Sequence, residues 1–161
     1  MWHHRGSVLL AAVTALAVPA AVAGCSGSSG PPAPKPSGQA AQACRALHGQ
    51  LPDAVDGQQR ISLDPASTYT AAWGDPAIEL RCGVPKPEKL TPGSEHYNPT
   101  AEAMEVNGVS WLLEKQDDGW RFTTTDRAAN VEVTVPGDYK PEAGVLTEFA
   151  APVKKAVPDR G

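Results

Sequence analysis

Alternation of apolar and polar residues with a period of two is the clearest pattern in the chain, and it predicts β-strands. In one stretch, Ile78, Leu80 and Cys82 alternate with Glu79 and Arg81. This strand is expected to turn one apolar face, which includes Cys82, toward a core.

Turn signals join further alternating stretches into hairpins. Asn107-Gly108 separates predicted strands at 104–106 and 109–113, and Asp118-Gly119 leads into a strand at 120–124. Both dipeptides are typical of tight hairpin turns. The chain from 104 to 124 is therefore expected to run up and down through neighbouring strands.

A last strand is predicted at 131–135, where three valines share one face and Pro136 ends the run. Within the second hairpin, Trp111 and Trp120 are expected to face each other, because aromatic pairs across strands stabilise sheets. Together the strands indicate an antiparallel meander.

Apolar residues spaced three and four apart predict one helix before the strands and one after them. The first helix contains Cys44 and Leu47 and ends before Pro52. The second follows Pro141, and Pro152 is expected to bend or split it. We therefore predict an α+β fold, in which an antiparallel meander of four or five strands packs an N-terminal and a C-terminal helix on one face.

The beginning of the chain has the pattern of an export signal. Arg5 supplies a positive charge, and residues 8–23 are apolar except for Thr14. Such a run spans roughly 24 Å as a helix, too short for the ~30 Å hydrocarbon core of a membrane. We expect residues 1–24 to be removed as a signal peptide.

Small residues precede a cysteine at the end of this run, and Val22-Ala23-Gly24-Cys25 resembles the lipobox of bacterial lipoproteins. The resemblance implies that Cys25 becomes the mature N-terminus and carries a diacylglyceryl anchor of the palmitate type, on the extracytoplasmic side of the cell membrane. Ordinary secretion is the alternative, since Ala21-Val22-Ala23 also fits a signal-peptidase site.

Three cysteines in an exported chain leave one unpaired unless one of them has a separate role. With Cys25 lipidated, Cys44 and Cys82 can form a single disulfide in an oxidising compartment. Closing the loop between them stabilises a domain by about 4 kcal/mol on the chain-entropy model. The alternative is a pair of buried free thiols.

Residues 26–42 are rich in proline, glycine and serine and contain no large apolar side chain. A segment of this composition cannot bury enough surface to fold, so we predict a tether over 25–42. The remaining residues, 43–161, are expected to form a single small globular domain.

Charge and composition exclude several classes of function. The formal net charge of −4 leaves no excess of cations for nucleic acid. His48 and His96 are the only histidines beyond the predicted signal, and no ligand spacing relates them, so no metal site is expected. The glycines fall in turns and in the tether, which gives no phosphate-binding loop and no expected cofactor.

Three side chains are candidates for a ligand or partner surface. Trp73 is either a platform for a ligand or a residue buried against the disulfide, and burial is favoured. His96 follows Glu95 in a loop rich in proline and glycine, where an exposed histidine without a role is the simpler interpretation. Arg127 either binds an anion or pairs within the protein, for example with a helix C-terminus.

Five blocks of sequence occur in an order that resembles a known family. They lie at 73–76, 81–84, 106–111, 124–127 and 131–136. The chain is similar there to a family of small actinobacterial envelope proteins, known only as domain of unknown function 3515. The resemblance implies a signal or membrane-anchor segment and a cysteine pair like Cys44 and Cys82, and it implies no reaction.

The sequence favours a lipid-anchored, non-enzymatic domain, because it shows no recognisable catalytic set. Such a domain would contact another envelope protein or a cell-wall component through its sheet face or through the proline-rich loop from Pro85 to Pro99. The alternative is an envelope enzyme that acts on cell-wall material. Such an enzyme would use general acid–base chemistry at Glu95 and His96, or would hold an anionic group with Arg127.

Overall fold

A computed structural model describes residues 29–160 of the chain. The predicted signal peptide and the predicted lipidation site at Cys25 lie outside the described residues. Within the described range, no helix combines the length and the apolar character needed to cross a membrane.

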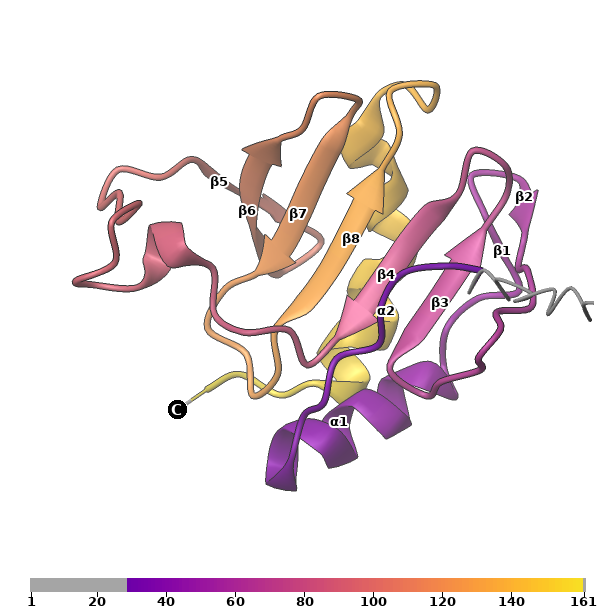
Figure 1. The fold of residues 1–161 in the computed structure, drawn as a ribbon, viewed down its shortest axis with the longest axis horizontal. Coiled ribbons are helices and arrows are strands. Elements are labelled where there is room, and N and C mark those ends of the chain that lie inside the picture. The colour runs from indigo at the N-terminus through magenta and orange to yellow at the C-terminus, as the bar shows by residue number, and fades with distance from the viewer. Residues whose placement is uncertain (1–28, 161) are drawn as a thin grey trace, which may run out of the picture.

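Six antiparallel strands form the main sheet, in the spatial order β3-β4-β8-β7-β6-β5 (Figure 1). A separate two-stranded ribbon, β1 and β2, precedes them along the chain. The strands are β1 (Ala54–Val55), β2 (Gln58–Gln59), β3 (Thr70–Trp73), β4 (Ile78–Cys82), β5 (Ala103–Val106), β6 (Val109–Lys115), β7 (Trp120–Thr124) and β8 (Val131–Val135).

The α+β class is as predicted, but the sheet is larger than the predicted four or five strands. Only β5 to β8 form a meander. The strand β4 pairs with β8, and β3 pairs with β4 and forms the edge of the sheet opposite β5. β3 was not predicted, because all four of its residues are buried and the segment shows no alternation. A short run buried on both faces has no period that distinguishes it from other apolar segments.

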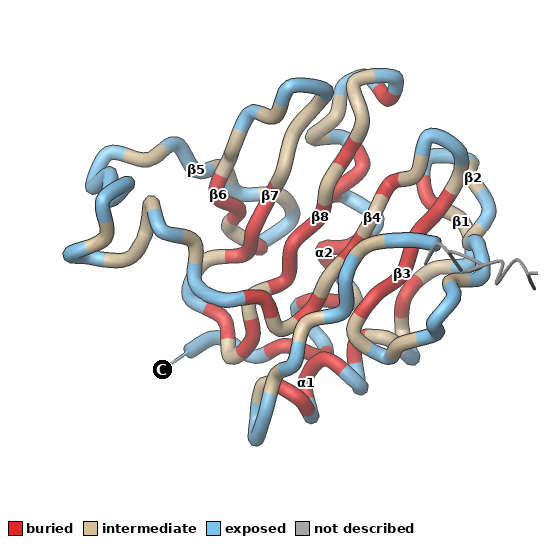
Figure 2. Tube along the Cα trace, in the orientation of Figure 1, coloured by how far each residue is buried: buried red, intermediate tan, exposed pale blue. Residues whose placement is uncertain are grey.

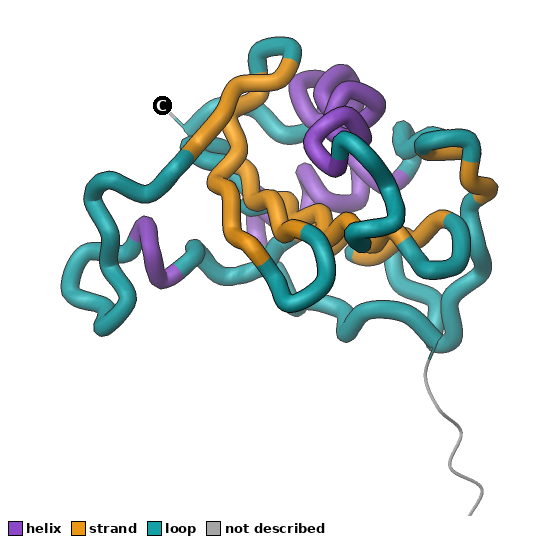
Figure 3. The backbone as a smooth tube through the Cα atoms, turned by 90° about the horizontal axis from the view of Figure 1, so that it is seen from above, coloured by secondary structure: helices purple, strands orange, loops and turns teal. Residues whose placement is uncertain are grey.

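Two helices cover one face of the curved sheet, α1 (Gly38–His48) and α2 (Leu146–Ala156) (Figure 3). Neither helix ends the chain, in contrast to the prediction of terminal helices. Pro152, which was predicted to bend or split the second helix, lies inside α2, and the helix continues through it without a split.

Helix α1 begins at Gly38, inside the range predicted as a tether. The segment before it also contacts the domain, since the backbone N–H of Ser29 donates to the carbonyl of Asp64 at 2.8 Å. Farther along, Pro36 packs so closely on Gly83 that a side chain at position 83 would overlap it. Residues 29–37 therefore run along the surface of the folded domain (Figure 1).

The core lies between the two helices and the sheet, where most buried residues of the strands and helices gather (Figure 2). The predicted disulfide is confirmed: Cys44 in α1 bonds to Cys82 in β4 and ties the first helix to the sheet. The predicted facing of Trp111 and Trp120 is wrong. The observed register sets Trp111 opposite Thr124 and Trp120 opposite Lys115, because the turn starts farther along β6 than the sequence suggested.

Candidate functional site

The sheet face opposite the helices carries charged side chains in four adjacent strands. Arg81 in β4 pairs in register with Glu132 in β8, and Arg121 in β7 pairs in register with Glu114 in β6. The alternation that buries one side of each strand aims these residues to the other side. Neither α1 nor α2 covers this face (Figure 3).

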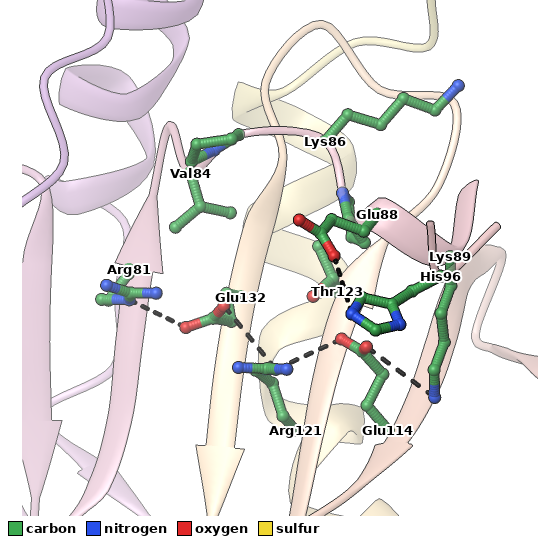
Figure 4. Close-up of a pocket in the computed structure, with 12 residues that line it drawn as sticks. Arg81, Val84, Lys86, Glu88, Lys89, His96, Glu114, Arg121, Thr123 and Glu132 are labelled. Carbon is green, nitrogen blue, oxygen red and sulfur yellow. Dashed lines mark hydrogen bonds and ion pairs between the residues drawn. The ribbon is translucent and has the colours of Figure 1, made fainter. Parts of the chain in front are cut away.

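These side chains form a charge ladder of alternating sign, completed by Lys89 (Figure 4). The Nε of Arg81 lies 2.8 Å from Oε1 of Glu132, and the Nε of Arg121 lies 3.2 Å from Oε2 of Glu114. The second oxygen of Glu132 is 4.0 Å from Arg121, and the ammonium of Lys89 is 3.8 Å from Glu114. Each carboxylate of the ladder thus lies between two cations.

The long connection between β4 and β5, residues 83–102, lies over one end of this face, and we call it the covering loop. It contains the 3-10 helix η1 (Glu88–Leu90). Asn130 holds its start by donating from Nδ2 to the carbonyl of Val84 at 3.1 Å. The hydroxyls of Thr91 and Ser94 donate to carbonyls within the loop, at 2.9 and 2.6 Å. These contacts tie the start of the loop to the residue before β8 and support the turns around η1.

Between the covering loop and the sheet lies an open groove of about 400 Å³. Its lining combines charged side chains with the apolar Val84, Pro85 and Pro87 and contains no Trp, Tyr or Phe. Four cations and three carboxylates line it, so the groove carries one more positive than negative group. The residues that form it are Arg81, Val84, Pro85, Lys86, Pro87, Glu88, Lys89, His96, Glu114, Arg121, Thr123 and Glu132.

Thr123 lies on the sheet side of the groove and is 1% exposed. Its hydroxyl has no hydrogen-bond partner among the described residues. A buried hydroxyl without a partner destabilises a fold by roughly 1–3 kcal/mol, so such groups are rare and call for an explanation. The indole N–H of Trp111 is the other unpartnered buried group of the described residues, but it lies on the helix side of the sheet.

Burial alters one acidic group beside the ladder. Glu79 precedes Arg81 by two residues and shares its face of β4, and burial raises the pKa of its carboxyl. The nearby charge of Arg81 opposes this shift, whereas that of Glu132 adds to it. The charged face is therefore partly withdrawn from water rather than fully solvated.

Of the three predicted surface residues, only His96 lines the groove. Its Nε2 lies 3.7 Å from Oε2 of Glu88, and both side chains are about two-thirds exposed. Figure 4 shows the two side chains pointing toward each other at the mouth of the groove. Glu95, which the sequence paired with His96, is not among the lining residues.

Trp73 does not line the groove and lies in the core. It is fully buried, its ring centroid is 5.3 Å from that of Phe149, and its indole N–H donates to the carbonyl of Pro52. The ring therefore offers no platform at the surface.

Arg127 has a structural environment as well. It is 5% exposed, and its guanidinium donates to the carbonyls of Val157 and Gly108 at 2.9 and 3.1 Å. Val157 directly follows α2, so Arg127 binds the C-terminal end of a helix, where a cation is favoured. His96, Trp73 and Arg127 thus do not share one cleft.

A smaller polar contact lies on the opposite edge of the molecule, near β3. The Nη2 of Arg60 lies 2.9 Å from Nε2 of His48, and the guanidinium also lies over the ring of Trp73. Burial, and secondarily the charge of Arg60, lowers the pKa of His48. His48 therefore accepts a hydrogen bond from Arg60 in its neutral form.

The charge ladder was missed by sequence reasoning, although its members alternate with the apolar residues that predicted the strands. The available signal was the polar half of that alternation, at Arg81, Glu114, Arg121 and Glu132. Recognising it requires knowing that β4 lies beside β8. Among residues 29–160, no group of three His, Cys, Asp or Glu residues could hold a metal ion.

Comparison with known proteins finds one protein family. The sequence model of that family, described as "Protein of unknown function (DUF3515)", matches residues 7–161. No curated protein matches the chain. No solved structure matches it either.

Proposed function

The chain belongs to the DUF3515 family, and we propose that it is an exported protein, lipid-anchored at Cys25, whose folded domain acts by binding rather than by catalysis. Its partner is another protein of the cell envelope or a component of the cell wall. The contact surface is the groove between the covering loop and the charge ladder.

The observation that carries this proposal is the groove itself. The covering loop borders an array of alternating charges that extends across four strands and one 3-10 helix. Charges arranged in this way select the partner and its orientation more than they add affinity. The unpartnered hydroxyl of Thr123 in the same groove supports a ligand that supplies the missing hydrogen bond.

Binding is favoured over catalysis because the groove lacks a desolvated acid–base pair. The one histidine in it, His96, is exposed, and its contact with Glu88 exceeds hydrogen-bond distance. A catalytic acid or base is usually set apart by burial together with a specific partner. Arg127, the predicted anion holder, is occupied by backbone carbonyls in another part of the fold.

The proposed anchor would hold the domain close to the membrane. Because residues 29–37 run along the domain, only the four peptide steps from Cys25 to Ser29 separate the lipid from the fold. An extended chain of this length spans about 14 Å. The contact surface would thus be presented to partners near the membrane surface.

Two experiments test the proposal in the source cell. Metabolic labelling with a fatty acid and membrane fractionation are compared for the native chain and for Cys25→Ser, and the label and the membrane fraction should be lost together in the variant. Equal labelling of both chains would refute the anchor.

The contact surface is tested by a photo-crosslinking amino acid. It is placed at Lys86, on the exposed rim of the groove, or at Lys155, an exposed position on α2. A discrete crosslinked species at position 86 but not at 155 is expected. The absence of any species specific to position 86 would refute the groove as the contact surface.

A further inference from the structure

The charge ladder leaves part of its hydrogen-bonding capacity unused. Arg81 and Arg121 bind their carboxylates through Nε, and no acceptor among the described residues binds their terminal Nη groups. A guanidinium presents its terminal N–H groups in a planar fork that matches the two oxygens of a carboxylate. The floor of the groove therefore offers donors for a planar anion.

A simple anion does not satisfy the whole site. Glu132 and Glu114 flank the two arginines and offset their charge, so a ligand that carried only negative charge would be repelled by both carboxylates, even though the lining as a whole has one cation more than it has carboxylates. At the mouth of the groove, the side chain of Glu88 is 68% exposed, and no Lys or Arg among the described residues lies within 4.0 Å of its carboxylate; the imidazole of His96, 3.7 Å away, is its one neighbour of this kind. This carboxylate is available to a ligand cation.

The size and the lining of the groove restrict the class of ligand further. A groove of about 400 Å³ lies in the range of sites for small molecules or for the end of a chain. Because no aromatic ring other than that of His96 lines it, it lacks the stacking surface that a flat, apolar ligand would use. Thr123 adds one hydroxyl on the sheet side that can donate to an oxygen.

On the basis of the proposed binding function, we infer that the groove takes a small zwitterion, an amino acid or the free end of a peptide. Its carboxylate binds the Nη groups of Arg121 and Arg81, with Thr123 as an additional donor. Its ammonium group binds Glu88 at the mouth. The ligand thus continues the alternation of charge that the ladder already has.

The inference is tested by isothermal titration calorimetry of the full chain in detergent at constant ionic strength. Four probes separate the chemistries: glycylglycine, acetate, ethylammonium and inorganic phosphate. Glycylglycine is expected to bind most tightly, acetate about tenfold more weakly, and ethylammonium and phosphate more weakly still. Tighter binding of phosphate or of ethylammonium than of glycylglycine would overturn the inference.

Variants locate the site. Glu88→Gln should remove the advantage of glycylglycine over acetate, and Arg121→Gln should weaken both probes about tenfold. Glu105→Gln removes a carboxylate from an exposed position of the edge strand β5, outside the groove, and should change nothing. Equal effects of Glu88→Gln and Glu105→Gln would contradict the assigned geometry.

Thr123→Val tests the hydroxyl without depending on a charge. The two side chains have the same shape, so the variant is expected to fold, and the affinity for glycylglycine should fall about fivefold. An unchanged affinity would remove Thr123 from the site.

The failure of this inference is distinguishable from that of the proposed function. A specific crosslink at position 86 without binding of glycylglycine would overturn the ligand class alone. Absence of both would overturn the groove as a binding surface.

Discussion

The guanidinium of Arg81 donates to the carboxylate of Glu132 at 2.8 Å, although the two residues are 51 positions apart in sequence. The two residues are direct partners in the register of β4 and β8, on the sheet face opposite α1 and α2. Glu132 is 8% exposed, which is unusual for a carboxylate in so small a domain. The pair joins the meander to the strands that precede it.

Removing the charge of Glu132 should destabilise the fold, even when a polar side chain of similar shape remains. Glu132→Gln leaves Arg81 with a neutral partner in a largely buried position, and we expect a loss of about 1.5–3 kcal/mol in the free energy of unfolding. Urea denaturation followed by circular dichroism measures this loss. Glu105→Gln, at an exposed position of β5, serves as the control and should stay within about 0.5 kcal/mol of the native chain. A similar value for Glu132→Gln would mean that the pair is not a stabilising contact.

The parts of the fold that could be predicted from the sequence depend on local patterns and on the count of cysteines. The hairpins around Gly108 and Gly119 are local, because turn chemistry and alternation act within a few residues, and the structure has them. The disulfide followed from inward-facing positions of Cys44 and Cys82 and from the count of cysteines.

The missing parts are non-local. Alternation specifies which face of β4 is buried, but it carries no information about which strand lies beside it. The pairing of β4 with β8, and hence the contact between Arg81 and Glu132, depends on packing across the whole sheet. The charged groove could not be predicted for this reason, and the covering loop that closes it shows no periodicity at all.

The contact between His48 and Arg60 predicts a pH dependence of stability. The pKa of His48 is lowered in the fold, from its ordinary value of 6.5, by burial first and by Arg60 second. The unfolded chain therefore binds the proton more tightly, so this contribution to stability is present above pH 6.5 and is lost as the pH falls below it. His48→Gln should remove this contribution.

Thermal unfolding at two values of pH, one above and one below 6.5, measures the effect of His48. The native chain should lose more stability on acidification than His48→Gln does. His96→Gln is the matched control, since it removes an imidazole that is about two-thirds exposed, and it should follow the native chain. Parallel curves for the native chain and His48→Gln would show that His48 does not titrate with folding.

Gly119 is expected to be among the positions of the chain least tolerant of substitution. Its φ of +86° lies in the region that favours glycine, and a Cβ at this position would overlap the carbonyl oxygen of Val135. Gly119→Ala should therefore destabilise the domain by more than about 3 kcal/mol.

Gly93 in the covering loop separates the effect of the backbone conformation from the effect of the close contact with Val135. It has a similar φ of +88°, but a Cβ there would meet no atom within 4 Å. Gly93→Ala should thus show only the backbone term, about 1–2 kcal/mol. If both variants lose the same stability in urea denaturation, the close approach of Gly119 to Val135 makes no contribution.

The bond between Cys44 and Cys82 relates the stability of the domain to the compartment in which it works. It closes a loop of 38 positions and connects α1 to β4, so the double variant Cys44→Ala/Cys82→Ala should lose about 4 kcal/mol in the free energy of unfolding. Cys25→Ser is the control, because it replaces the third cysteine, the proposed lipidation site, and leaves the disulfide in place. Addition of a reductant should destabilise the native chain and Cys25→Ser alike and should leave the double variant unchanged. A small domain has a total stability of only about 5–15 kcal/mol, so a loss of this size is a large fraction of it. The domain is therefore expected to be stable in an oxidising compartment and only marginally stable in a reducing one.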